Sequence, residues 1–302
     1  MHGIIYTFHM PLFMFASGYI YIAFKRDESY GHFLWKKVKR LMIPYITTSI
    51  IVVTIKLLTQ SFMYVENPVS LISYFRIFYL PEAGFYLWFI WALWWIFCLI
   101  PFFKTKKSRL LLLGISVVLH YISPFLNLPA VFCLRETAKM LIWFMLGVAC
   151  FDWKVSICEV KGWHVLISLA VFAVMLIITS TGGISFYGTN RLLKRCGAFL
   201  GCCKYLIPYL GILFVMFFSK WISQHAVPKV LVVISSSSYI IYLFHTTFMG
   251  FTKAILSKVA FMKELPVLTI IIVVATGVIC PILLHYFLNK ASITRFLFGI
   301  TK

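Results

Sequence analysis

The sequence predicts an all-α, polytopic integral membrane helix bundle. Of its 302 residues, 62% are apolar and only 12% are charged, whereas about a quarter of the residues in an ordinary soluble domain carry charge. Because a bilayer-spanning helix takes about 20 apolar residues, the apolar content suffices for about nine spans. The net charge of +20 comes from short clusters between apolar runs, where basic residues set membrane orientation. That placement argues against nucleic acid as a partner, which the charge alone would allow.

Continuous apolar runs bounded by charged or turn residues are expected to cross the membrane. In hydrocarbon the backbone amides must bond within their own segment or in a closed barrel, and these runs do not alternate, so we expect helices. The run at 137–151 is short and could begin nearer Val131. We expect a single membrane-embedded domain over residues 1–302. The runs lie at 3–24, 41–62, 85–103, 110–128, 137–151, 163–180, 198–219, 231–252 and 266–288.

The loops between the runs predict the orientation of the chain. Basic residues crowd the loop after the first run and the loop after the third, including Lys36, Lys37 and Arg40 in the first of these. Placing both loops in the cytoplasm puts most of the Lys and Arg residues on that side. The positive-inside rule then predicts a multi-pass protein of the cell membrane with a cytoplasmic C-terminus and an outside N-terminus.

The chemistry available inside the predicted spans is mainly that of histidine. All eight Asp and Glu residues lie outside the spans, which disfavours an ion-coupled transporter that relays charge through buried acids. His9, His120, His245 and His285 lie within spans, and each could be a packing residue or a working base. The eight cysteines form no CxxC pair and lie mostly in or beside apolar runs. They indicate membrane packing, with neither a disulfide framework nor a metal site.

The first run is more specific than its composition. His9 precedes Pro11 by two residues, and a proline removes one backbone donor and opens a helix. Such a break tends to line a cavity. Ser17 and Gly18 are small enough to allow a close helix neighbour. A basic, helix-like approach then leads to Pro44 inside the second run.

Four segments of this sequence resemble the membrane acyltransferase-3 family, and within it the fucose 4-O-acetylase-like proteins and polysaccharide O-acetyltransferases. They occur in the family's order between Phe8 and His245. The resemblance implies transfer of an acyl group, usually acetyl from acetyl-CoA, onto a carbohydrate hydroxyl of a cell-surface or exported glycan, at a bacterial plasma membrane. The segments are FHMPLFMFASGY at Phe8–Tyr19, FLWKKVKRLMIPY at Phe33–Tyr45, LWFIWAL at Leu87–Leu93 and SSYIIYLFH at Ser237–His245.

The resemblance also implies a binding site for the acyl donor in the first basic loop. Lys37 and Arg40 occupy the positions of the family's paired arginines, and with Lys36 they would hold the phosphates of CoA. Lysine at the first position loses the bidentate geometry of arginine. The same cluster could instead set topology and touch anionic lipid headgroups.

Acyl transfer to a sugar hydroxyl needs a base and a donor for the developing oxyanion. We expect His9 to supply one of these functions and His245 to be a second polar contact in the outer half of the bilayer. Trp88 and Ser17 are candidates for contact with the sugar, although an aromatic belt at the membrane interface is the better explanation of Trp88 and its neighbouring tryptophans. No metal is expected, and the expected partners are the lipid bilayer, acyl-CoA and a carbohydrate acceptor.

One departure from the family keeps two other interpretations open. Family members normally begin with one more span, which bears a histidine regarded as catalytic, whereas this sequence starts in what resembles the second span. The chain would then be a truncated acyltransferase, or a short form that is inactive or works by another route. A non-catalytic membrane protein of polysaccharide export is the alternative function.

Overall fold

A computed structural model describes residues 2–300 with the exception of 64, 66, 127, 128, 130, 155–158, 186–205, 226, 260, 262 and 263, and only the backbone of 2–7 and 178–185. The described residues contain helices, turns and loops but no strand. They cluster in two compact units, each built from three segments of the chain. Unit 1 comprises Met1–Arg26, Phe103–Leu126 and Ala138–Val227, and unit 2 comprises Asp27–Phe102, Asn127–Thr137 and Pro228–Lys302.

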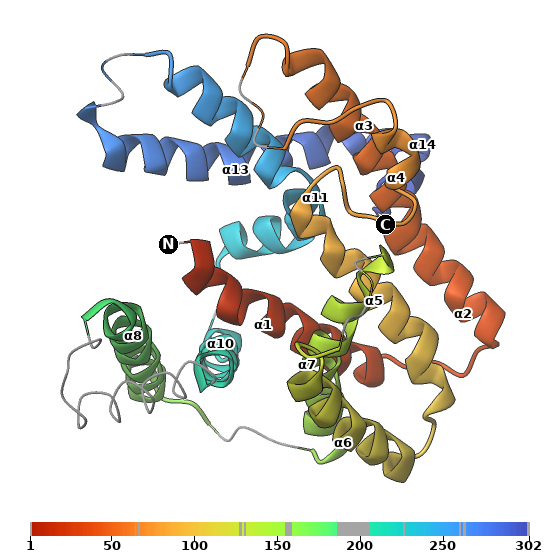
Figure 1. The fold of residues 1–302 in the computed structure, drawn as a ribbon. Helices are drawn as coiled ribbons and strands as arrows, with labels where there is room; N and C mark the ends of the chain where they lie inside the picture. Colours follow the sequence, from red (N-terminus) through yellow and green to blue (C-terminus); the bar gives the residue numbers. More distant parts are fainter. Residues whose placement is uncertain are drawn as a thin grey trace. The chain divides into compact units, whose positions relative to one another are not determined.

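Each predicted span contains a helix among the described residues (Figure 1). Residues 198–205 of the seventh run lie outside the described residues. Unit 1 holds α1 (His2–Ala23), α6 (Lys106–Ile122), most of α7 (Leu134–Asp152), α8 (Gly162–Ser185) and α10 (Ile207–Ser223). Unit 2 holds α2 (Tyr30–Lys37), α3 (Ile43–Thr59), α4 (Ser73–Arg76), α5 (Trp88–Leu99), α11 (Lys229–Leu256), α13 (Pro266–Leu288) and α14 (Ser292–Leu297), with short turns η1 (Val38–Met42), η2 (Phe85–Leu87), η3 (Ile100–Phe102) and η4 (Val131–Cys133).

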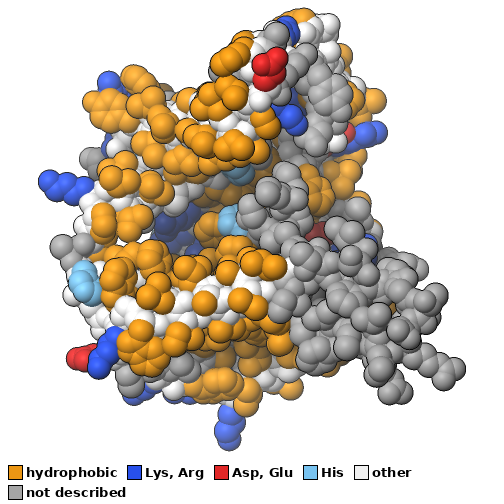
Figure 2. All heavy atoms as spheres, turned by 90° about the vertical axis from the view of Figure 1, so that its left-hand side faces the viewer, with side chains coloured by type: hydrophobic (Ala, Val, Ile, Leu, Met, Phe, Trp, Pro, Cys, Tyr) orange, Lys and Arg blue, Asp and Glu red, His pale blue; other side chains and the backbone are white. Residues whose placement is uncertain are grey.

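The surface of these helices is that of a membrane protein. Four described helical stretches are long and apolar enough to cross a bilayer, namely Tyr30–Thr59, Phe85–Phe102, Lys229–Leu256 and Pro266–Leu288. In the last of these only 11% of the most apolar window is buried. Hydrophobic side chains cover most of the described surface seen in Figure 2. Apolar exposure on this scale marks a lipid-facing surface, so the predicted fold class is confirmed, while nine as the number of crossings stays a prediction.

Local sequence signals set several helix ends. Thr105 and Ser108 form a capping box at the start of α6, each side chain bonding the other residue's backbone N–H. Prolines occupy the first turns of α10 and α13 (Pro208 and Pro266), where the missing backbone donor is not needed by the helix itself. Pro44 differs, because it is the second residue of α3 and directly follows the helical turn η1. In the short fifth run the α-helix begins at Leu134, between the expected start at residue 137 and the earlier alternative at Val131. Phe132 in the preceding turn η4 has a φ of 58° and is not helical.

Helix α1 continues through Pro11 without ending, and Pro11 is buried. The proline removes one backbone donor, and the helical pattern continues on both sides of it. The sequence predicts that Pro11 opens the helix, whereas α1 runs through Pro11 without a break in its helical assignment. Further along, a Cβ on Gly18 would overlap the backbone carbonyl of Phe144 in α7, and a Cβ on Gly147 would overlap that of Phe15. The two helices thus cross with their backbones in contact, which is the close neighbour expected at Gly18.

We expect Gly147→Ala to separate α1 from α7 and to lower stability by about 1–3 kcal/mol, the usual cost of overpacking. Thermal unfolding of the detergent-solubilised protein measures this loss. Gly114→Ala is the matched control, because nothing lies within 4 Å of a Cβ added there and alanine favours the helix over glycine. An unfolding temperature of Gly147→Ala equal to that of the wild type would contradict the close crossing.

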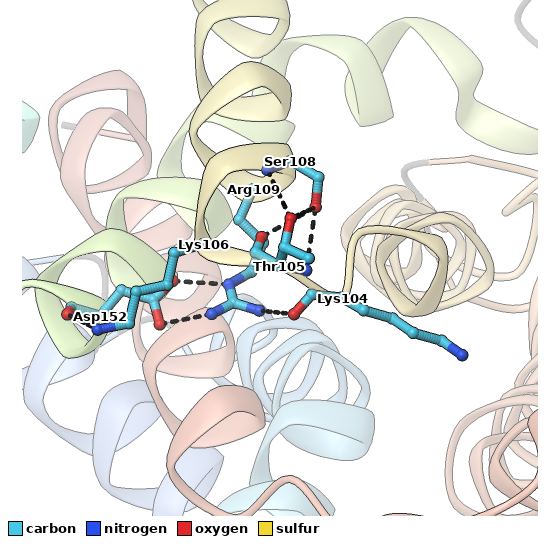
Figure 3. Close-up of polar contacts among 6 residues, drawn as sticks. All are labelled: Lys104, Thr105, Lys106, Ser108, Arg109 and Asp152. Atoms are coloured by element: carbon cyan, nitrogen blue, oxygen red, sulfur yellow. Dashed lines mark hydrogen bonds and ion pairs between the residues drawn. The ribbon is translucent and has the colours of Figure 1, made fainter.

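A buried ion pair fastens the start of α6 to the end of α7 (Figure 3). The Arg109 guanidinium donates to both carboxylate oxygens of Asp152, from Nε at 2.6 Å and from Nη2 at 2.7 Å, and Nη1 donates to the Lys104 carbonyl at 2.6 Å. The two side chains are 9% and 10% exposed. Lys106 Nζ also donates to the Asp152 carbonyl at 3.2 Å. Arg109 therefore joins two helices of unit 1.

Asp152→Ala is expected to cost about 3–5 kcal/mol of stability, because it leaves the buried guanidinium without its counter-charge. The double variant Arg109→Met/Asp152→Leu should recover most of that loss, since neither buried charge then remains. Lys107→Ala, at an exposed cation in the first turn of α6, should be close to neutral. Thermal unfolding of the three variants compares these effects, and a neutral Asp152→Ala would show that the pair does not hold the helices together.

Candidate active site

The predicted site residues are divided between the two units. The basic cluster, the tryptophan and the second histidine belong to unit 2, whereas the first histidine and the serine lie on α1 in unit 1. The residues in unit 2 are Lys36, Lys37, Arg40, Trp88 and His245, and those in unit 1 are His9 and Ser17.

The basic cluster of unit 2 ends in a π-turn, Val38–Met42, in which the Ile43 N–H bonds to the Val38 carbonyl five residues back. Pro44 accounts for this irregular turn. It has no N–H to offer the carbonyl of Arg40 four residues earlier, and its ring would clash with that carbonyl in an α-helix. The turn widens instead. Turns of this kind are frequent at functional sites.

The three cations of the cluster have different surroundings. Lys36 forms an ion pair with the carboxylate of Glu28. Lys37 Nζ lies 3.8 Å from the centroid of the Phe97 ring and 5.3 Å from that of Phe33, so it is held by cation–π contacts. Arg40 is exposed, and no ion pair to it occurs within the described residues. Arg40 is therefore the cation of this cluster best able to bind an added anion.

His245 has a defined tautomer. Its Nδ1 lies 3.0 Å from the Ile241 carbonyl and 2.9 Å from the Tyr242 carbonyl. Carbonyl oxygens only accept hydrogen bonds, so Nδ1 must be the protonated nitrogen. In the neutral ring Nε2 then carries the lone pair. This is the form that a general base requires.

Two tyrosines connect the His245 segment of α11 to the η2 turn. The Tyr86 hydroxyl donates to the Leu243 carbonyl at 2.7 Å, and the Tyr242 hydroxyl donates to the Tyr86 carbonyl at 2.7 Å. The Tyr86 ring also meets the imidazole edge-on, with centroids 5.2 Å apart. Trp88 directly follows η2 and is only 6% exposed, so it is packed into unit 2, and its contact with a sugar stays a prediction.

Helix α5 connects the cations with this histidine. Phe97, under Lys37, lies near its C-terminal end, while Tyr86, beside His245, lies in the turn before its first residue. The helical rise between Tyr86 and Phe97 amounts to about 16 Å. Unit 2 therefore carries a cationic turn and an imidazole protonated at Nδ1 at opposite ends of one helix.

The residues on α1 have simpler surroundings. The His9 ring meets the Phe13 ring edge-on at 4.7 Å between centroids, and Ser17 is half-buried two turns further along. Their roles stay predictions.

The sequence did not indicate the partners of the other interior histidines. In unit 2, His285 Nδ1 lies 2.7 Å from Ser237 Oγ, which links α13 to α11. In unit 1, His120 Nδ1 lies 2.7 Å from the Lys139 carbonyl. Because each contact joins two different helices, residue spacing along a single helix carries no signal for it.

The described part of the chain contains no group of three or more His, Cys, Asp or Glu side chains able to hold a metal ion. Cys98, Cys133, Cys150 and Cys280 are free thiols, and Cys158, Cys196, Cys202 and Cys203 lie outside the described residues.

Comparison with known proteins identifies the family. The family described as an acyltransferase domain matches residues 1–286, which include the π-turn, α5 and the histidine segment of α11. Comparisons with curated proteins and with solved structures gave no match. Since the matched region spans most of the sequence and both units, the chain belongs to the membrane acyltransferase-3 family.

Proposed function

We propose that this protein moves an acetyl group from acetyl-CoA on the cytoplasmic side of a bacterial plasma membrane to a hydroxyl of a cell-surface or exported carbohydrate. Family membership supports a membrane acyltransferase. The observation that carries the finer proposal is the arrangement along α5, where a cationic π-turn and a histidine with its Nε2 lone pair lie at opposite ends of one helix.

The cationic turn suits the donor. CoA carries a pyrophosphate and a 3′-phosphate, and an arginine can bind such groups through two parallel hydrogen bonds. Arg40 would make the principal phosphate contact. The positive charges of Lys36 and Lys37 would add to the electrostatic attraction of the CoA phosphates. The charge pattern of the loops supports a cytoplasmic position for this turn and for the C-terminus. The extended arm of CoA would then lie along α5 and carry the thioester toward His245.

The imidazole suits the transfer step. Nε2 of His245 would accept the proton of the sugar hydroxyl as its oxygen attacks the thioester carbonyl. The tetrahedral intermediate would then break its C–S bond, and the imidazolium would return the proton to the departing CoA thiolate. His9, on α1, is the second imidazole of this proposal and would act as a base or as a donor to the oxyanion. Ser17 and Trp88 are proposed to contact the sugar.

His245→Ala and His9→Ala are each expected to lower acetyl transfer by about 10²–10⁴-fold, the usual contribution of a general base, without loss of protein from the membrane. The measurement is incorporation of label from acetyl-CoA into glycan by membranes that contain each variant. His225→Gln, at an exposed histidine, is the control and should retain activity. Wild-type activity in either alanine variant would remove that histidine from the mechanism.

Arg40→Ala is expected to raise the KM for acetyl-CoA by about 10- to 100-fold, the loss that follows when charge-assisted hydrogen bonds are removed. Arg40→Lys should be intermediate because lysine lacks the bidentate geometry. Lys107→Ala, in the first turn of α6 in unit 1, serves as the charge-matched control. An unchanged KM in Arg40→Ala would assign the cluster to membrane topology and lipid headgroups.

The same assay separates this proposal from a role in polysaccharide export. An enzyme transfers label in the assay, and deletion of its gene removes acetyl groups from the glycan. An export protein transfers no label, and its deletion leaves the acetylation of the glycan unchanged.

A further inference from the structure

The last described residues of the chain fold back onto unit 2. After α13 the chain turns at Ala291 and forms α14, which packs against α3 (Figure 1). The Thr294 hydroxyl fastens this turn, since it bonds to the Leu288 carbonyl at the end of α13 and lies 2.9 Å from the Ala291 carbonyl. The segment 292–300, called the C-terminal clamp below, is therefore tied to two helices of the unit.

The clamp ends in a Schellman motif. The Gly299 N–H bonds to the Phe296 carbonyl at 3.3 Å, and the Ile300 N–H bonds to the Arg295 carbonyl at 2.9 Å. Gly299 has a φ of 63°, the left-handed conformation that this motif requires and that glycine adopts most easily. Phe298 beside it is buried, with its ring 5.7 Å from that of Phe244 on α11. The clamp is thus docked by an aromatic side chain as well as by backbone hydrogen bonds.

Gly299 lies directly against the cationic π-turn. A Cβ at this position would stand 2.9 Å from Pro44 Cγ, 3.1 Å from the Arg40 carbonyl oxygen and 3.5 Å from Arg40 Cα. The clamp therefore lies against the two residues that produce the turn. Pro44 has no backbone N–H, and the Arg40 carbonyl consequently lacks its usual helical hydrogen bond. Both the backbone angle and the available space require glycine here.

This contact lies partly outside the region that the family shares. The match to the acyltransferase family ends at residue 286, whereas the clamp begins at residue 292. The turn is inside the matched region and the segment that covers it is not.

We propose that the C-terminal clamp fixes the position of the π-turn and thereby sets how well Arg40 binds the phosphates of acyl-CoA. The inference rests on the proposed function and makes Gly299 a positioning residue that acts through Arg40. A π-turn can relax toward other helical geometries, and any such change rotates the residues that it carries. Because a bidentate arginine contact depends on alignment, a displacement of about 1 Å is enough to weaken it strongly.

The first test compares Gly299→Ala with Gly250→Ala, whose added Cβ would meet nothing within 4 Å. We expect Gly299→Ala to raise the KM for acyl-CoA roughly tenfold or more while kcat at saturating acyl-CoA is retained. Gly250→Ala should leave both unchanged. A wild-type KM in Gly299→Ala, or a fall in kcat with no change in KM, would overturn the proposal.

A double variant separates positioning from general damage. If Gly299 acts only through Arg40, Gly299→Ala/Arg40→Ala should have the same KM as Arg40→Ala alone, because coupled residues are not additive. Full additivity of the two effects would show that the glycine acts by another route. Phe298→Ala undocks the clamp without forcing backbone strain and should raise the KM in the same direction, so it replaces Gly299→Ala if that variant does not accumulate. Phe298→Leu should restore most of the affinity.

A binding measurement needs no turnover. Adenosine 3′,5′-bisphosphate, the phosphate-bearing end of CoA, is titrated into the full-length protein in detergent, and its Kd is compared between wild type, Gly299→Ala and Phe298→Ala. We expect binding to the wild type and weaker binding, by a similar factor to the KM change, in both variants. Equal binding in all three would overturn the clamp and leave the proposed function standing. No binding to the wild type would overturn both.

Discussion

Pro44 has no backbone N–H, and the geometry at the basic end of unit 2 follows from that lack. The Arg40 carbonyl cannot take its usual helical partner, so the chain widens into a π-turn at Val38–Met42. Arg40 in the widened turn is exposed. The Arg40 backbone lies against Gly299 at the end of the clamp. One missing donor thus determines the form of the surface that is proposed to receive the nucleotide end of CoA.

The rest of the candidate site is arranged around α5. At one end of this helix Lys37 rests on the Phe97 ring, and at the other Tyr86 exchanges hydrogen bonds with the segment that carries His245. Because the backbone carbonyls of α11 hold Nδ1 of the imidazole, its lone pair points away from its own helix. Packing and hydrogen bonding fix both ends before any ligand binds, as preorganised acyl transfer requires.

The sequence predicted the fold class because the membrane imposes it. Long apolar runs such as 266–288 must be helical, and α13 has those bounds. The sequence could also place Arg40 and His245 on their helices, since both lie in segments that resemble the family. It could not predict the π-turn, because an internal proline is compatible with a kink, a turn or an unbroken helix, as Pro11 demonstrates in α1. The tautomer of His245 and the contact of Gly299 with Arg40 depend on atomic distances, which the sequence does not contain. Gly299 and Arg40 are also far apart along the chain, so no local pattern links them.

The ion pair between Arg109 and Asp152 has a consequence for how the protein is made. The two residues are 43 positions apart, so the arginine leaves the ribosome well before its acid. A buried guanidinium without its counter-charge is several kcal/mol less favourable than a paired one. The pair can therefore form only after the end of α7 has been synthesised, and it then joins the two ends of the α6–α7 hairpin that lie farthest apart in the sequence.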